Sequence, residues 1–302
     1  MPKGNLKHYL HLHFLVFIAG FTAILGELIT IGSFALVWFR MLIAAVLMLL
    51  YIKITKKQLR INKRLALQLA IAGAIIAAHW ITFFEAINQS NVSITLAMFS
   101  SGAFFASFIE PIFFKRSVLW YEILFGVIVI FGVSLITQGE LKYINGIVLG
   151  LSSALFSTLF AVINGKLILK HKASVISFYE FVSGVFFITI GILFFYDGFT
   201  KEFFSLSNSD WIYIFILASI CTAYAFIAAV EIMKYISPFT VILSYNLEPV
   251  YGILLALYFF PEKEQMSTQF YYGAIVIICA VILDAIFKNR RKNKIAKTNL
   301  SG

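Results

Sequence analysis

Residues 85–98 read EAINQSNVSITLAM and join one apolar run to the next through a very short polar break. Residues 231–244 read EIMKYISPFTVILS and repeat this arrangement 146 positions later. Further along each half, FKRSVLWYEILFGVIVIFGVSLI and PEKEQMSTQFYYGAIVIICAVIL share a glycine near a helix start, Gly126 and Gly273. The two halves of the chain are therefore predicted to be structural repeats of each other.

The composition is that of an integral membrane protein. The 302 residues are 61% hydrophobic and 13% charged, and the mean hydropathy is +0.93, whereas a soluble domain is about half apolar and a quarter charged. Apolar runs of roughly 20 residues match the thickness of a bilayer. The runs are continuous and do not alternate with polar residues, which argues against a membrane barrel. The first run lacks a small-residue cleavage site, so it is predicted to be a retained helix.

Ten transmembrane helices are expected, five in each half. They are predicted at residues 10–26, 33–52, 66–87, 92–114, 118–138, 144–167, 175–196, 210–234, 238–260 and 268–287. Because five is odd, the second half enters the membrane in the opposite orientation, which makes an inverted repeat. The predicted fold class is all-α, with repeats at 1–138 and 139–302 and a basic tail from about residue 288.

The distribution of positive charge agrees with this topology. Lys142, Lys201 and Lys263 lie in loops predicted outside and Arg40 lies within a helix, while the other 20 of the 24 Lys and Arg residues lie on the cytoplasmic side. This asymmetry follows the positive-inside rule and places both termini in the cytoplasm. The basic clusters have no aromatic platform beside them, so the net charge of +10 is not interpreted as a nucleic-acid surface.

The sequence gives no sign of a cofactor, a metal site or catalysis. Cys221 and Cys279 each lie in an apolar run without a Cys or His at metal-binding spacing, and they are expected to be small buried hydrophobic residues. No Walker A, GxSxG or HExxH motif occurs, and no paired catalytic aspartates. The chain is therefore predicted not to be an enzyme.

A family resemblance rests on RMLIAA in the second helix and EPVYGILLALYFFPEKEQMS in the ninth. With ten short helices in two halves, the chain resembles the EamA-type branch of the drug/metabolite transporter superfamily over its whole length. The resemblance implies a carrier of the bacterial inner membrane, often an exporter of amino acids or other metabolites, with a central cavity. Pro249 and Glu262 match the family pattern. Gly102 and Lys115 at the equivalent positions of the first half depart from it, as does Ala19 in place of the family's tryptophan.

Four ionisable residues lie deep within apolar runs, where a charge costs about 3 kcal/mol or more: Arg40, His79, Glu180 and Glu248. Glu248 precedes Pro249, which is expected to break the helix and to free a carbonyl near Ser244 and Tyr245. Glu248 would bind the amine of a zwitterionic substrate, carry a proton during the cycle, or form a structural ion pair. Tyr245 shares its helix face.

Arg40 would clamp a carboxylate or phosphate, or pair structurally with Glu180 or Glu27. His79 would change protonation as the carrier opens, or make one interhelical hydrogen bond, and Trp80 beside it would hold an apolar or cationic part of the substrate.

Ser100, Asn164 and Tyr224 would supply neutral polar lining or close helix packing. The predicted set of residues that bind or translocate substrate is Arg40, His79, Trp80, Ser100, Asn164, Glu180, Tyr224, Tyr245 and Glu248.

The predicted function is secondary-active export or exchange of small metabolites, amino-acid-like or amphiphilic, by alternating access. The expected partners are a small-molecule substrate and membrane lipid, with proton coupling left open. The alternatives are a channel-like facilitator and a membrane sensor or enzyme that does not transport. The last two are disfavoured because no soluble output module or reactive dyad occurs in the sequence.

Overall fold

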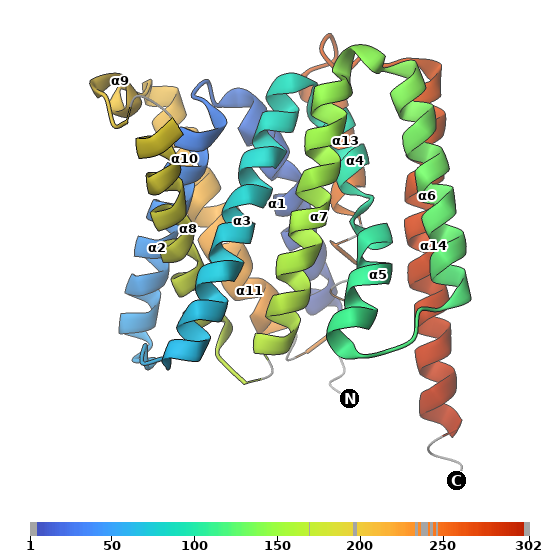
Figure 1. Ribbon diagram of the computed structural model, residues 1–302, viewed down its shortest axis with the longest axis horizontal. Helices are drawn as coiled ribbons and strands as arrows, with labels where there is room; N and C mark the ends of the chain where they lie inside the picture. The colour runs from blue at the N-terminus through green and yellow to red at the C-terminus, as the bar shows by residue number, and fades with distance from the viewer. Residues whose placement is uncertain are drawn as a thin grey trace.

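The computed structural model describes residues 5–168, 170–195, 198–232, 235–236, 241, 244–245 and 247–298, of which residues 195, 230, 285, 288–289 and 291–298 are described by backbone alone. The elements in these ranges are all helical and stand side by side in one bundle (Figure 1). Eight helical stretches are long and apolar enough to cross a membrane, and the apolar helices Glu248–Phe259 and Thr268–Asp284 are shorter. Together they give the ten transmembrane helices of an all-α membrane protein.

The helices of the first half begin and end close to the predicted positions. They are α1 (Leu6–Leu28), α2 (Ser33–Ile54), α3 (Lys63–Gln89), α4 (Val92–Phe99), α5 (Gly102–Phe114) and α6 (Trp120–Gly139). The polar breaks supply the signals that start two of them, because the side chains of Asn62 and Asn91 accept backbone N–H groups as N-caps of α3 and α4. The predicted fourth helix is interrupted at Ser100 and Ser101, so it consists of α4 and α5.

The second half repeats this order after a short 3₁₀ turn, η1 (Leu141–Tyr143). Its helices are α7 (Ile144–Leu167), α8 (Ala173–Phe195), the short α9 (Lys201–Phe204), α10 (Asn208–Ala218), the π-helical η2 (Ser219–Tyr224), α11 (Ala225–Ile232), α13 (Glu248–Phe259) and α14 (Thr268–Thr298). The eighth predicted helix contains the π-helical segment, and the tenth is longer than predicted. Residues 238–240, 242–243 and 246 of the ninth predicted helix lie outside the described residues.

The packing of the helices is symmetric between the halves. Three contacts join corresponding predicted helices of the two halves, since α2 packs on α8, α4 of the fourth helix packs on α13 of the ninth, and α6 packs on α14. Other contacts occur in matched pairs: α3 packs on α7 as α10 and η2 pack on α1, and α1 packs on α13 as α4 and α5 pack on α7. In Figure 1, α6 ascends and α14 descends beside it. The two five-helix repeats are therefore inverted relative to each other.

The two ends of the bundle differ in the segments that they carry. One end carries α9 and the loop from α13 to α14 and is called the Lys263 end. The other carries the start of α1, the start of α3 and the loop from α5 to α6, and is called the Arg64 end (Figure 1). The large hydrophobic residues exposed in the middle of helices, such as Ile130, Phe186 and Leu254, fit a bilayer environment.

The two cysteines differ in environment. Cys221 is buried as predicted, but Cys279 is exposed. The prediction of a buried Cys279 was wrong because hydropathy alone cannot separate the side of an apolar helix that faces the bundle from the side that faces lipid.

Candidate functional site

Arg40 lies at the centre of the candidate site. Its side chain is 3% exposed, its Nε donates to Oγ1 of Thr222 at 2.9 Å, and its guanidinium lies 3.8 Å from the centre of the Trp80 ring. Phe84 lies further away on the same side, at 5.6 Å. The Nη1 atom has no hydrogen-bond partner among the described residues. A buried guanidinium with an unused donor is suited to bind a carboxylate.

The π-helical segment explains why Thr222 meets Arg40. Oγ1 of Thr222 also donates to the carbonyl of Leu217, five residues earlier, at 2.8 Å. One extra residue in this turn rotates the following side chains relative to a regular α-helix, and such segments often occur at functional sites. Thr222 was not predicted, because nothing in the sequence marks a π-helical turn.

The second charged residue of the site, Glu248, belongs to the second half. It is the first residue of α13 and is partly buried, and its carboxylate interacts electrostatically with both Arg40 and Tyr245. Arg40 belongs to α2, so the two charges come from different repeats. The structure thus brings together Arg40, Trp80, Tyr245 and Glu248 of the predicted set.

The helix crossing beside Glu248 is very close. A Cβ atom on Gly20 would lie 2.9 Å from the nitrogen of Gly252 and 3.0 Å from the carbonyl oxygen of Glu248. Only glycine at these positions allows α1 and α13 to approach this closely. Backbone contact between the two helices therefore sets the position of Glu248.

The break predicted next to Pro249 lies just before it, at Leu247, a turn between the helical residues Ser244 and Tyr245 and the start of α13. Pro249 lies in the first turn of α13, where its missing N–H costs no helical hydrogen bond. The carbonyl of Ser244 is not free, because it accepts the N–H of Leu247 at 3.0 Å. The site is therefore built at a helix start rather than around a carbonyl freed at Ser244.

Helix starts occupy equivalent positions in the two repeats. α5 begins at Gly102 and α13 begins at Glu248, 146 residues later. At the first of these, the hydroxyl of Ser101 is fully buried and has no described partner, and the carbonyl of Gly102 accepts from Thr158 at 3.1 Å. Interrupted helices at equivalent positions of two inverted repeats are typical of substrate sites in secondary carriers.

His79 makes an interhelical hydrogen bond. Its Nδ1 lies 2.9 Å from Oγ of Ser153 and 3.1 Å from the Ser153 carbonyl, and its ring lies between Phe99 and Phe160 at centroid distances of 5.4 and 5.6 Å. Two roles were considered for His79, a change of protonation during transport and an interhelical hydrogen bond, and this geometry matches the hydrogen bond. It fixes Trp80, the next residue, against Arg40.

The expected ion pairs of Arg40 are absent among the described residues. Glu180 is fully buried and accepts from Nδ2 of Asn164 at 3.3 Å, and Glu27 pairs with Lys263 at 2.7 Å. The prediction that Arg40 pairs with Glu180 or Glu27 was therefore wrong. Oε1 of Glu180 and Oδ1 of Asn164 lack described partners, so they form a second polar position between α7 and α8.

Two predicted residues lie apart from this centre. The Tyr224 side chain is 41% exposed, and its hydroxyl lies 2.8 Å from Nε2 of His11. The hydroxyl of Ser100 donates to the carbonyl of Leu96 in its own helix at 3.0 Å. Neither side chain contacts Arg40 among the described interactions.

Polar contacts tie the two repeats together at the Lys263 end. Lys263 pairs with Glu27 of α1. The buried Glu264 accepts the N–H groups of Val92 and Ser93 at 3.1 and 3.0 Å, at the start of α4. Burial raises the pKa of Glu264, and these donors act against that shift. The residue expected from the family pattern, Glu262, is exposed.

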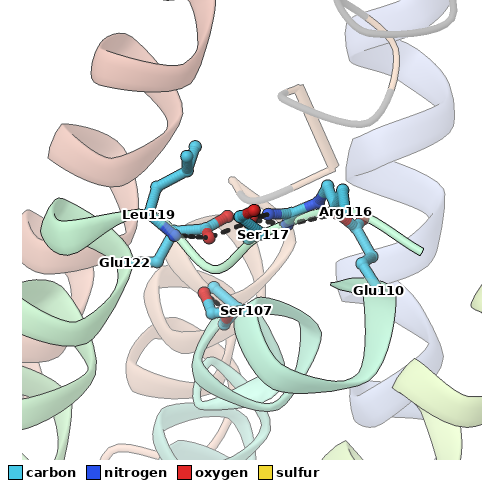
Figure 2. Close-up of polar contacts among 7 residues, drawn as sticks. Ser107, Glu110, Arg116, Ser117, Leu119 and Glu122 are labelled. Atoms are coloured by element: carbon cyan, nitrogen blue, oxygen red, sulfur yellow. Dashed lines mark hydrogen bonds and ion pairs between the residues drawn. The ribbon is translucent and has the colours of Figure 1, made fainter. Parts of the chain in front are cut away.

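The equivalent cation at the Arg64 end is bound within one repeat. Arg116 lies 147 positions before Lys263. Its two terminal nitrogens donate to Glu122 at 2.9 and 2.7 Å, and Nη2 also donates to Glu110 at 3.1 Å (Figure 2). These bonds raise the pKa of Arg116, the bond to Glu122 most of all. Arg116 thus joins α5 to α6 and does not link the repeats.

At the Arg64 end the repeats meet through histidine and tyrosine. The contact of His11 with Tyr224 is accompanied by one between Nδ1 of His13 and the hydroxyl of Tyr251 at 3.2 Å. Both histidines belong to α1, whose other end carries Glu27. Polar contacts therefore hold α1 to the second half at both ends.

Comparisons with known proteins place this geometry in context. A family model described as the EamA-like transporter family matches twice, over residues 7–138 and 144–284. Among solved structures, one described only as "Crystal structure of protein" is similar over 94% of this chain and 99% of its own, with 12% identity and a TM-score of 0.64. At this identity the similarity concerns the fold alone. The comparison with curated proteins found no match.

Proposed function

Because the chain belongs to the EamA-like transporter family and is a multi-pass membrane transporter of small molecules, we propose that it is a secondary-active carrier of small zwitterionic metabolites. The observation that carries the proposal is that Arg40 and Glu248, opposite charges from different repeats, influence each other electrostatically without forming a direct ion pair in the described part of the chain. A zwitterion offers a carboxylate to Nη1 of Arg40 and an ammonium group to Glu248. The Trp80 ring holds the guanidinium in place.

Alternating access is supported by the contacts at the two ends. A carrier must open one end while the other stays closed. The Lys263–Glu27 ion pair at one end and the His11 and His13 contacts at the other all tie α1 to the second half, and each is an interaction that rocking of the repeats would break in turn. A channel-like facilitator would need both sets to be open together.

The cellular setting follows from the charge asymmetry. With 20 of its 24 cationic residues on one side by the predicted topology, the chain is proposed to lie in a bacterial inner membrane with both termini in the cytoplasm. The Arg64 end then faces the cytoplasm and the Lys263 end faces outward. Export is the proposed direction, and a proton bound by Glu248 is the proposed coupling ion.

The experiment is counterflow of labelled amino acids and organic cations in proteoliposomes, with and without a pH gradient. The native chain is compared with Glu248→Gln and with Glu262→Gln, which makes the same change at an exposed carboxylate. Saturable counterflow that responds to pH, fails in Glu248→Gln and persists in Glu262→Gln supports the proposal. Flux without counterflow identifies a channel-like facilitator, and counterflow unchanged in Glu248→Gln makes this carboxylate structural.

A further inference from the structure

A basic cleft of about 340 Å³ opens at the Arg64 end, between the start of α3 and the end of α7. Its charged walls are Arg64 on α3, Lys166 in the last turn of α7 and Lys170 in the loop that follows, and His171 also lines it. The two walls belong to different repeats. The cleft is remote from Arg40 and plays no part in the proposed substrate site.

No carboxylate neutralises the charge of this cleft among the described residues, although the Lys166 ammonium lies over the Phe113 and Phe114 rings. The sequence contains no Asp or Glu between Glu27 and Glu85, and none between Glu140 and Glu180. No ion pair joins the cleft's cations to a carboxylate in the described part of the chain. Like charges across a narrow cleft repel each other unless an anion lies between them.

The cleft is a preformed feature of the packed bundle. Its floor is Leu65 and Leu167, which belong to one buried cluster with Leu69 and Ile176. The loop before α3 is held by the hydroxyl of Tyr179, which donates to the Leu59 carbonyl at 2.6 Å.

The start of α3 adds to the attraction for an anion. The side chain of Asn62 accepts only the N–H of Leu65, at 2.8 Å. The N–H groups of Lys63 and Arg64 thus stay available at the positive end of a 27-residue helix.

Apolar surface continues from the cleft toward the membrane. Arg64, Gln68 and Ile71 share one face of α3, by helical spacing. Gln68 lines the cleft, and the Ile71 side chain is 51% exposed one turn further along. Leu67 and Ile168 beside the cleft are also exposed. A ligand with an anionic head and an acyl chain fits both the basic cleft and the apolar surface beside it, whereas a soluble anion would use only the cleft.

We propose that this cleft binds the phosphate group of an anionic phospholipid and so bridges the two repeats at the Arg64 end. Basic pockets between transmembrane helices at a cytoplasmic surface bind lipid headgroups in this way. Arg64 from one repeat and Lys166 and Lys170 from the other hold the phosphate together, and the acyl chain lies along Ile71.

The test measures phosphatidylglycerol binding to the detergent-purified chain by native mass spectrometry and by thermal stabilisation, with phosphatidylcholine as the neutral lipid. The cleft variant is R64Q/K166Q/K170Q. The control is K53Q/K56Q/R60Q, which removes the same charge from exposed residues outside the cleft.

We expect phosphatidylglycerol to bind and stabilise both the native chain and the control. The affinity of the cleft variant for this lipid should fall about tenfold or more. Equal loss in both variants, or equal binding of phosphatidylcholine, overturns the proposal. Inorganic phosphate that stabilises the native chain as well as the lipid does identifies a soluble anion site and also overturns it. If the triple variant does not purify, Lys170→Gln alone must weaken binding relative to Lys53→Gln, and equal binding counts against the lipid site.

Discussion

Replacement of Gly20 by alanine tests whether backbone contact between α1 and α13 sets the site. The added Cβ would lie 2.9 Å from the Gly252 nitrogen, 3.0 Å from the Glu248 oxygen and 3.2 Å from Cβ of Tyr251, where ordinary contacts are 3.4–4 Å. Two of these three atoms are backbone, so the helices must separate by roughly 0.5 Å. Such overpacking costs about 1–3 kcal/mol.

In a helix, replacing glycine by alanine also stabilises the helix itself by about 1 kcal/mol. A control substitution must therefore include the same increase in helix stability. Gly191→Ala in α8 does so, because its Cβ would meet nothing closer than Phe34 at 3.9 Å. We therefore expect Gly20→Ala to be less stable than Gly191→Ala by about 1–3 kcal/mol.

The assay combines thermal unfolding in detergent with counterflow in proteoliposomes. A displacement of Glu248 by half an ångström loosens the site, so exchange should fall by roughly tenfold in Gly20→Ala and stay near the native rate in Gly191→Ala. If Gly20→Ala is as stable as Gly191→Ala and exchanges at the native rate, the close crossing does not position Glu248.

Three further predictions concern single contacts. Arg40→Lys keeps the charge but loses the planar stacking and the Nε bond, so exchange should fall by about tenfold or more, and native exchange would refute the role given to the guanidinium. Glu264→Gln removes the charged acceptor of two N–H groups at the start of α4. A cysteine placed at Ser93 in a cysteine-free background should then react faster with a soluble maleimide. An unchanged rate would contradict the role of Glu264 in capping α4. A double-mutant cycle on Lys263 and Glu27 should give a coupling below about 1 kcal/mol because the lysine is 67% exposed. The bond to Glu27 raises the pKa of Lys263. The coupling energy between the two side chains is therefore fully present below the ordinary lysine pKa and is lost only as the pH rises through the raised value. A coupling energy that falls between pH 7 and 9 would show that the pair is not formed.

The membrane-spanning stretches were predictable because polar breaks in the sequence separate most of them. Asn62 and Asn91 mark starts that the structure reproduces. The interruption at Ser100 was not predicted, since residues 92–114 form one apolar run and a serine hydroxyl satisfies a helix carbonyl as readily as it marks a break. The π-helical turn at Thr222 leaves no hydropathy signal either.

The charged residues of the site were predictable by type, but their partners were not. A charge within an apolar run identifies Arg40 and Glu248 from the sequence. Thr222 lies 182 residues from Arg40, and only the packing of η2 on α2 brings them together. The same holds for Glu27, which is near Arg40 in the sequence and yet pairs with Lys263. The repeat boundary at 138 and 139 and the roles of the site residues stay predictions.

Different kinds of contact hold the two ends of the bundle, so dissolved salt is expected to affect the two ends differently. The pair of Lys263 and Glu27 is a surface ion pair, so dissolved salt weakens it. The contacts of His11 with Tyr224 and His13 with Tyr251 need no full charge, and salt hardly changes them. The chain thus combines symmetric helix packing with different kinds of contact at its two ends. For the proposed carrier, we expect ionic strength at the Lys263 end to shift the balance between its conformations, and salt at the other end to leave that balance nearly unchanged.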